Sequence, residues 1–187
     1  MLVVSLGAGA QALILGQVQG LGTNTIAVIP GREPSGPSDV TALFSDSLKE
    51  KDVVALRNKT NVPYLKNIMP TIFGAGSSSY GANTYQVTIF GATELIAEVF
   101  DLHPTEGRFF DESDVLSRGN VTVIVSKVAE HLFDGQDPIG QNIKVKNRSL
   151  RVIALLPPSG GGSLFNFDQM ILIPYTTAES YILGQKY

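Results

Sequence analysis

The sequence has no cysteine, and its first 31 residues carry no charged side chain. Without cysteine the chain can form no disulfide, no zinc–thiolate site and no thiol nucleophile. With 14 basic and 17 acidic residues and a net charge of -3, it also lacks the basic composition typical of proteins that bind nucleic acid. What is present is a chain of 187 residues, 43% of them hydrophobic, which is long enough to bury a core.

The uncharged N-terminal segment is too short to cross a membrane by itself. Its apolar part runs from Leu2 to Leu15, which is about 14 residues against the roughly 20 that a bilayer requires. No basic region precedes it, so it does not fit a signal peptide either.

The same segment contains a nucleotide-binding pattern of low specificity. Residues 7–12, GAGAQA, match G-x-G-x-x-A, and Arg32 follows a possible strand from Thr25 to Ile29. A dinucleotide-binding fold needs a repeated strand–helix–strand order, whereas a Pro/Gly/Ser-rich stretch follows at 33–39. No Walker motif is present. We therefore predict that the chain binds no cofactor.

The first half of the chain predicts one helix and two strands. Ser47-Leu48-Lys49-Glu50 forms a capping box that opens a helix through Arg57. A strand from Val62 to Phe73 is interrupted by two prolines, and alternation predicts another from Thr84 to Ala92. Between them, residues 74–82 are mostly Gly, Ala and Ser, which predicts a flexible hairpin tip.

The second half predicts a series of strands and helices with clear boundaries. Val121–Val125 is a β-branched run typical of a buried strand. Ser126 is positioned to cap a helix that buries Val128, Leu132 and Phe133. The remaining elements are a turn at 137–140, a strand with Ile143 and Val145, a strand at 150–156, a loop at 159–163, a strand at 169–174 and a terminal helix at 178–183 capped by Thr176 or Thr177.

Few residues qualify as candidates for chemistry. His103 has several acidic neighbours, but their spacing fits no metal-ligand template. His131 lies beside Glu130 on a helix, and Ser126-Lys127 has no partner base placed by the sequence. We predict no metal site and no catalytic residue, so the chain is not expected to be an enzyme.

Arg108 has a different character, because it stands between a glycine and two phenylalanines and is followed by acidic residues. We predict a charge-assisted bond from Arg108 to Asp111 or Asp114 that holds the turn together. The residues to which we assign a structural role are Arg108, Phe109, Phe110, Phe133, Pro138 and Gly140.

The order of these segments resembles the extracytoplasmic core domain of MacB-type ABC transporter permeases. The segments are LGTNTIAVIPG (21–31), GRFF with its acidic residues (107–114), SKVAEHLF (126–133), DPIG (137–140), RVIALL (151–156) and ILIPYTTAE (171–179). The resemblance implies an α+β fold in two lobes: a porter-like α/β lobe from 1–75 and 150–187, which begins with a stalk helix, and an inserted β-rich lobe from 76–149.

The resemblance also implies a function. The domain would lie on the periplasmic or extracellular side of the membrane and relay ATP-driven motion of the permease's membrane helices to a partner or an exported substrate, without catalysing a reaction itself. Its implied partners are an ABC ATPase domain or subunit, a second permease copy in the membrane and a periplasmic adaptor protein, but no nucleic acid. The adaptor would contact loop tips, for which the candidates are Ser77, Ser78, Ser79 and Tyr80. The alternatives are a lipoprotein-releasing permease domain and an extracellular ligand-binding module.

Overall fold

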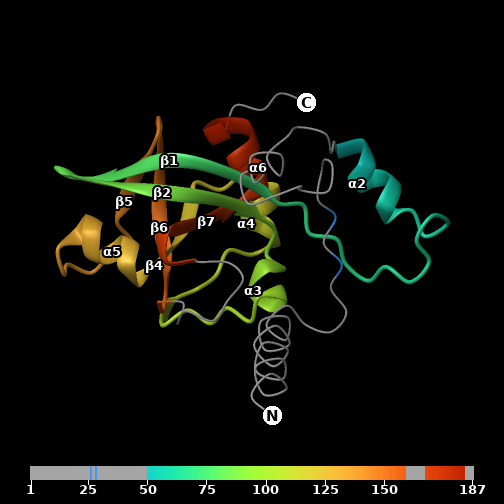
Figure 1. The fold of residues 1–187 in the computed structure, drawn as a ribbon, viewed down its shortest axis with the longest axis horizontal. Coiled ribbons are helices and arrows are strands. Elements are labelled where there is room, and N and C mark those ends of the chain that lie inside the picture. Colours follow the sequence, from blue (N-terminus) through green and yellow to red (C-terminus); the bar gives the residue numbers. More distant parts are fainter. Residues whose placement is uncertain (1–25, 27, 29–49, 159–166, 184–187) are drawn as a thin grey trace, which may run out of the picture.

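The computed structural model describes residues 26, 28, 50–158 and 167–183 (Figure 1). The N-terminal stalk, the GAGAQA segment, Ser47 to Lys49 of the capping box and the loop at 159–163 lie outside the described residues. Within the described residues, no helix is long and apolar enough to cross a membrane. The elements in chain order are α2 (Glu50–Arg57), β1 (Ile72–Tyr80), β2 (Asn83–Ala92), α3 (Ile96–Val99), β3 (Glu106–Gly107), α4 (Glu112–Leu116), β4 (Val121–Val125), α5 (Ser126–Phe133), β5 (Asn142–Val145), β6 (Arg148–Leu156), the 3-10 turn η2 (Phe167–Gln169), β7 (Met170–Pro174), α6 (Tyr175–Thr177) and the π-helical η3 (Ala178–Leu183).

The strands form one sheet in the order β3-β6-β4-β7-β2-β1-β5. Because β5 also pairs with β6, every strand except β3 belongs to a closed ring of hydrogen-bonded neighbours. The pairs β2–β7 and β4–β6 are parallel, and the other pairs are antiparallel. A ring leaves fewer exposed strand edges than an open sheet, so its strands hold each other in register.

The hydrophobic core lies on both faces of this sheet, because successive strand residues point to opposite sides. In β2, Ile89 belongs to the cluster that packs against α5, while the next residue, Phe90, belongs to the cluster beneath α3 and α4. In β7, Ile171 and Ile173 face α5 and Leu172 faces the other way. The continuous apolar runs in these strands therefore reflect burial on both faces.

Most of the predicted elements are confirmed. The helix that ends at Arg57 and the strands at 84–92, 121–125, 150–156 and 169–174 are present within a few residues of their expected bounds. In α5 the buried side chains are Val128, Ala129, Leu132 and Phe133. The strand with Ile143 and Val145 buries both, as its alternation predicts.

The prediction for residues 62–82 is wrong. No strand lies between 62 and 71, and β1 instead occupies most of the expected loop. It pairs with β2 along its whole length, from Ile72 opposite Gly91 to Tyr80 opposite Asn83, so that the hairpin tip is only Gly81 and Ala82. Low β propensity in a Gly/Ser-rich segment is overridden here by pairing with a strong neighbouring strand.

The predicted helix caps at Ser126 and at Thr176 or Thr177 are also wrong. Ser126 is the first residue of α5 and its hydroxyl donates to the Leu156 carbonyl at 2.8 Å rather than capping the helix. The terminal helix begins at Tyr175, and the Thr176 and Thr177 hydroxyls donate to the carbonyls of Val115 and Gly119. These hydroxyls connect separate elements instead of ending one.

The sheet draws on both of the expected lobes. The boundary at 149/150 falls inside the β5–β6 pair, and β2 and β4 of the inserted segment pair with β7 of the C-terminal segment. Most of 1–49 lies outside the described residues, so the division into two lobes stays a prediction.

Ser78 provides a test of how β1 is packed. Its side chain is 0% exposed, and its hydroxyl has no hydrogen-bond partner among the described residues. A buried unsatisfied hydroxyl costs roughly 1–3 kcal/mol, so Ser78→Ala should raise the urea midpoint of unfolding by the equivalent of about 1 kcal/mol. Ser78→Asp should lower it sharply, because an unpaired charge would be buried.

The matched variants are Ser79→Ala and Ser79→Asp, one position along β1, where the side chain is half-buried. Both should change the midpoint much less than their Ser78 counterparts. Equal effects at the two positions would show that Ser78 is not buried as described.

Candidate functional site

The four residues expected at a partner-binding tip lie on β1. Ser78 points toward the α5 face of the sheet, because its cross-strand neighbours are Val145 on β5 and Tyr85 on β2. The Tyr80 ring lies 4.4 Å from that of Phe133, measured between centroids. Ser77, Ser79 and Tyr80 keep partly exposed surface, whereas Ser78 is inaccessible to a partner in this conformation.

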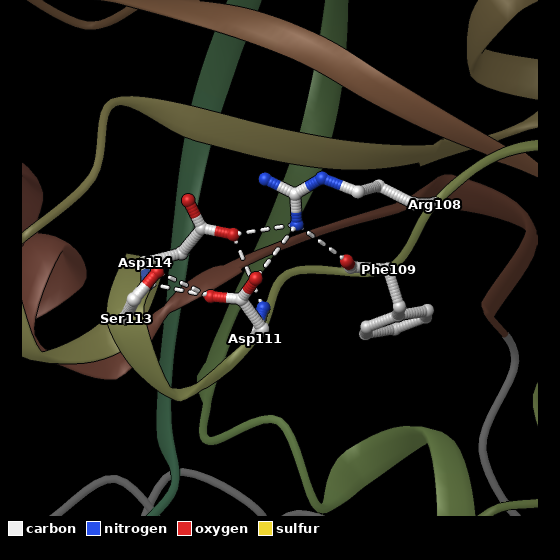
Figure 2. Close-up of polar contacts among 5 residues, drawn as sticks. All are labelled: Arg108, Phe109, Asp111, Ser113 and Asp114. Carbon is white, nitrogen blue, oxygen red and sulfur yellow. Dashed lines mark hydrogen bonds and ion pairs between the residues drawn. The ribbon is translucent and has the colours of Figure 1, made fainter.

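Arg108 joins the turn after β3 to the start of α4 (Figure 2). Its Nη1 lies 2.8 Å from Asp114 Oδ2 and 3.4 Å from Asp111 Oδ2, and it donates to the Phe109 carbonyl at 2.9 Å. Asp111 caps α4, since its Oδ1 accepts from the Asp114 backbone N–H at 3.0 Å, while Asp114 Oδ2 accepts from the Asp111 N–H at 3.1 Å. One guanidinium and two carboxylates therefore fix the direction in which α4 leaves the turn.

This network shifts two pKa values. Hydrogen bonds from the Ser113 hydroxyl and the Asp114 backbone N–H lower the pKa of Asp111 below its ordinary value of 3.8. The hydrogen bond to Asp114 raises the pKa of Arg108, so the guanidinium stays charged. A carboxylate with a lowered pKa stabilises the fold above its unfolded-state pKa, and this contribution is lost as the pH falls through the lowered value.

We expect Asp111→Asn to make the melting temperature fall less steeply with decreasing pH below about pH 4. Asparagine also caps helices well, so the change removes mainly the charge and its contact with Arg108. Glu112→Gln, at the exposed neighbouring position, is the control and should follow the wild-type pH profile. Parallel profiles for Asp111→Asn and the wild type would contradict this role of Asp111.

The remaining residues assigned a structural role lie at junctions of the fold. Phe110 and Phe133 are each 2% exposed, and they belong to the clusters on opposite faces of the sheet. Pro138 is buried, and Gly140 has a φ of +80° and donates its N–H to the Val152 carbonyl at 2.8 Å. Phe109 is half-buried, with its ring 5.0 Å from that of Phe110.

The two histidines have ordinary surroundings. His103 Nε2 lies 2.9 Å from Asp101 Oδ1 on the surface, and the His131 ring stacks on Tyr85 with centroids 4.2 Å apart. Among the residues that the structure describes, no group of three or more His, Asp or Glu side chains could hold a metal ion.

Sequence reasoning missed a second ionic contact, between α5 and η2. Lys127 Nζ lies 2.6 Å from Asp168 Oδ2, and the Asp168 side chain is only 11% exposed. The hydrogen bond to Asp168 raises the pKa of Lys127. The partners are 41 residues apart in sequence, and no local spacing signals a contact of that separation.

The described polar contacts thus join structural elements to one another. Arg108 ties a turn to α4, Thr176 and Thr177 tie α6 to α4 and its C-terminal loop, and Lys127 ties α5 to η2. These side chains hold separate elements of the domain in contact.

The sequence that forms this fold matches a known protein family. A family model described as the MacB-like periplasmic core domain matches residues 1–186. The chain belongs to this family. It is an extracytoplasmic domain of a MacB-like ABC transporter permease.

The relatives of this MacB-like domain are longer proteins. The chain is 31% identical over 185 residues to the macrolide export ATP-binding/permease protein MacB 2 of Aeromonas hydrophila, and 35% identical over 188 residues to MacB of Bordetella avium. Each match covers 99% of this chain and 28% of the relative. The chain thus spans less than a third of those proteins.

Two solved structures have the same fold as this MacB-like domain. The periplasmic region of MacB from Actinobacillus actinomycetemcomitans matches with a TM-score of 0.75 at 24% identity, over 92% of this chain and 75% of that one. The extracellular domain of the transporter YknZ from Gram-positive bacteria matches with a TM-score of 0.64 at 21% identity, over 84% and 75%.

Proposed function

We propose that this domain relays movement of the permease's membrane helices to a partner protein or to the exported substrate, without catalysing a reaction itself. The movement would be driven by ATP on a nucleotide-binding domain, a component that the relatives' names, ATP-binding/permease protein, support. The relatives' names also contain the words macrolide export. We therefore propose efflux as the role of the whole protein. A second permease copy and a periplasmic adaptor are the proposed partners.

The observation that carries this proposal is the attachment of α6 to the rest of the domain. The Thr176 hydroxyl donates to the Val115 carbonyl at 2.5 Å, and the Thr177 hydroxyl donates to the Gly119 carbonyl at 2.9 Å. Strand β7, which leads into α6, pairs with both β2 and β4 inside the ring. A displacement delivered through α6 would therefore move α4 and the sheet as one body.

Site-specific spin labelling gives a direct test, because within this chain only an introduced cysteine would take the label. A label at Glu130→Cys on α5, in the full-length permease, would report the distance between the two copies. We expect this distance to change when a non-hydrolysable ATP analogue and Mg²⁺ are added. The labelled pair Glu130→Cys and Lys144→Cys within one copy should keep its distance.

Two outcomes would count against the proposal. An inter-copy distance that does not respond to nucleotide would show that this domain does not move with the ATPase cycle. A large change within one copy would show that the domain deforms and does not transmit motion as a rigid body. Glu130 and Lys144 are both exposed on separate elements, so the labels themselves should not disturb the core.

A further inference from the structure

Strand β2 contains a glycine among large buried side chains. Gly91 follows Phe90 and lies two residues after Ile89, and all three residues are buried. A glycine inside a strand weakens the strand, because it has no side chain to pack, and it often marks a place where another backbone approaches closely. Gly91 is not among the glycines with a positive φ, so its backbone conformation suits other residues too. The feature that favours glycine here is therefore space.

The helix that follows β7 occupies the space above Gly91. A Cβ added at Gly91 would lie 2.6 Å from the Ala178 Cβ and 3.2 Å from the Tyr175 Cα. Carbon atoms in favourable contact are about 3.5–4.0 Å apart. Neither neighbouring atom can rotate away, because one is backbone and the other is bonded directly to it. A side chain at position 91 would thus have to push α6 and the start of η3 away from β2.

This contact lies where β7 passes into α6. Gly91 pairs with Ile173 on β7, and β7 ends one residue later, at Pro174. The chain then turns into α6 and packs back onto β2, the strand beside its own (Figure 1). Ala178 is 0% exposed and belongs to the same cluster as Ile89. The contact therefore joins the C-terminal helix to the core of the domain.

The two sides of this helix have different partners. Tyr175 and Ala178 are three residues apart and both approach Gly91, as expected for residues that share one helix face. The hydroxyls of Thr176 and Thr177, in between, donate to carbonyls of α4 and of the loop that follows it. Hydrogen bonds thus attach one side of α6, and close packing against a strand without a side chain attaches the other.

We propose that Gly91 is a positioning residue for the relay of movement, because it lets the C-terminal helix pack directly on the sheet. This inference rests on the proposed function, since a relay requires the helix and the sheet to move together. Closely packed protein interiors have low compressibility and transmit strain. A side chain at position 91 would separate the helix from the strand, and a displacement of the helix would then reach the sheet only in part.

The test measures how the distance between the Glu130→Cys labels of the two copies changes with nucleotide in the full-length permease. Gly91→Ala should reduce this change to about half or less of the wild-type change, because the helix is lifted off the strand. The swap Gly91→Ala/Ala178→Gly moves one methyl group across the contact and should restore most of the change. Ala178→Gly alone opens the contact without a clash and should reduce the change less than Gly91→Ala.

Gly76→Ala on β1 is the matched control. A Cβ added there would lie 3.0 Å from the Ile89 Cδ1, which is the end of a flexible side chain, and 3.4 Å from the Lys146 Cε. Those atoms can move without displacing a helix. Gly76→Ala should therefore respond to nucleotide as the wild type does.

Two further measurements distinguish a positioning role from a general structural one. ATP hydrolysis should continue in Gly91→Ala, and the distance between Glu130→Cys and Lys144→Cys within one copy should stay at its wild-type value. If Gly91→Ala alters that distance within one copy, Ala178→Gly takes its place as the test variant.

An undiminished response in a folded Gly91→Ala would overturn the proposal, and so would a loss that the swap does not recover. Where Ala178→Gly is the test variant, a full wild-type response would overturn it. These outcomes contradict only the role of Gly91. A wild type that does not respond to nucleotide would contradict the proposed function itself, and this inference with it.

Discussion

Replacing Gly107 by alanine should destabilise the domain by roughly 2–5 kcal/mol. Gly107 has a φ of +81°, a conformation that costs an L-residue about 1–2 kcal/mol. In addition, a Cβ at this position would collide with the Ile153 carbonyl oxygen and lie 2.9 Å from Ala154 Cα. These are backbone atoms of β6 and cannot rotate away, so the strand itself would have to shift, at a further cost of about 1–3 kcal/mol.

Gly135 supplies the matched control, because its φ is +83° and an added Cβ would meet nothing within 4 Å. Gly135→Ala should therefore lose only the conformational part, about 1–2 kcal/mol. Urea unfolding of the two variants separates the steric contribution from the conformational one. Equal free-energy losses would mean that β3 does not approach β6 as closely as described.

The sequence predicts an element best where its buried residues form one continuous apolar run or alternate strictly with exposed residues. The β-branched run Val121–Val125 and the alternating Ile143 and Val145 became β4 and β5 as expected. The Arg108 contact was also predictable, because its carboxylate partners lie within six residues of it. Local charge and periodicity are visible in a sequence without knowledge of the tertiary structure.

Features that depend on distant partners were missed. The Gly/Ser-rich β1 is a strand because β2 and β5 pair with it, and propensity alone predicts a loop there. Thr176 and Thr177 fitted helix caps in sequence, but their acceptors are carbonyls about 60 residues earlier, near α4.

The largest losses of stability should come from the two buried phenylalanines on opposite faces of the sheet. Phe133 ends α5 and contacts the ring of Tyr80, and Phe110 lies beneath α3 and α4 beside Phe109. Each is 2% exposed, so Phe133→Ala and Phe110→Ala should each cost about 3–5 kcal/mol through lost burial and the cavity left behind. Because a domain of this size is stable by only about 5–15 kcal/mol in total, either change should lower the melting temperature markedly.

Leu116→Ala is the control for both variants, since Leu116 is 75% exposed and a surface truncation of this kind should stay within about 0.5 kcal/mol. The two phenylalanines belong to separate clusters, so their effects should be independent, and a moderate pair of changes such as Phe133→Leu and Phe110→Leu should add to within roughly 0.5 kcal/mol. Strong non-additivity in that pair would show that the two faces of the sheet are coupled through β2, β4 and β7. A loss at Phe110 no greater than at Leu116 would show that the turn after β3 is not anchored in the core.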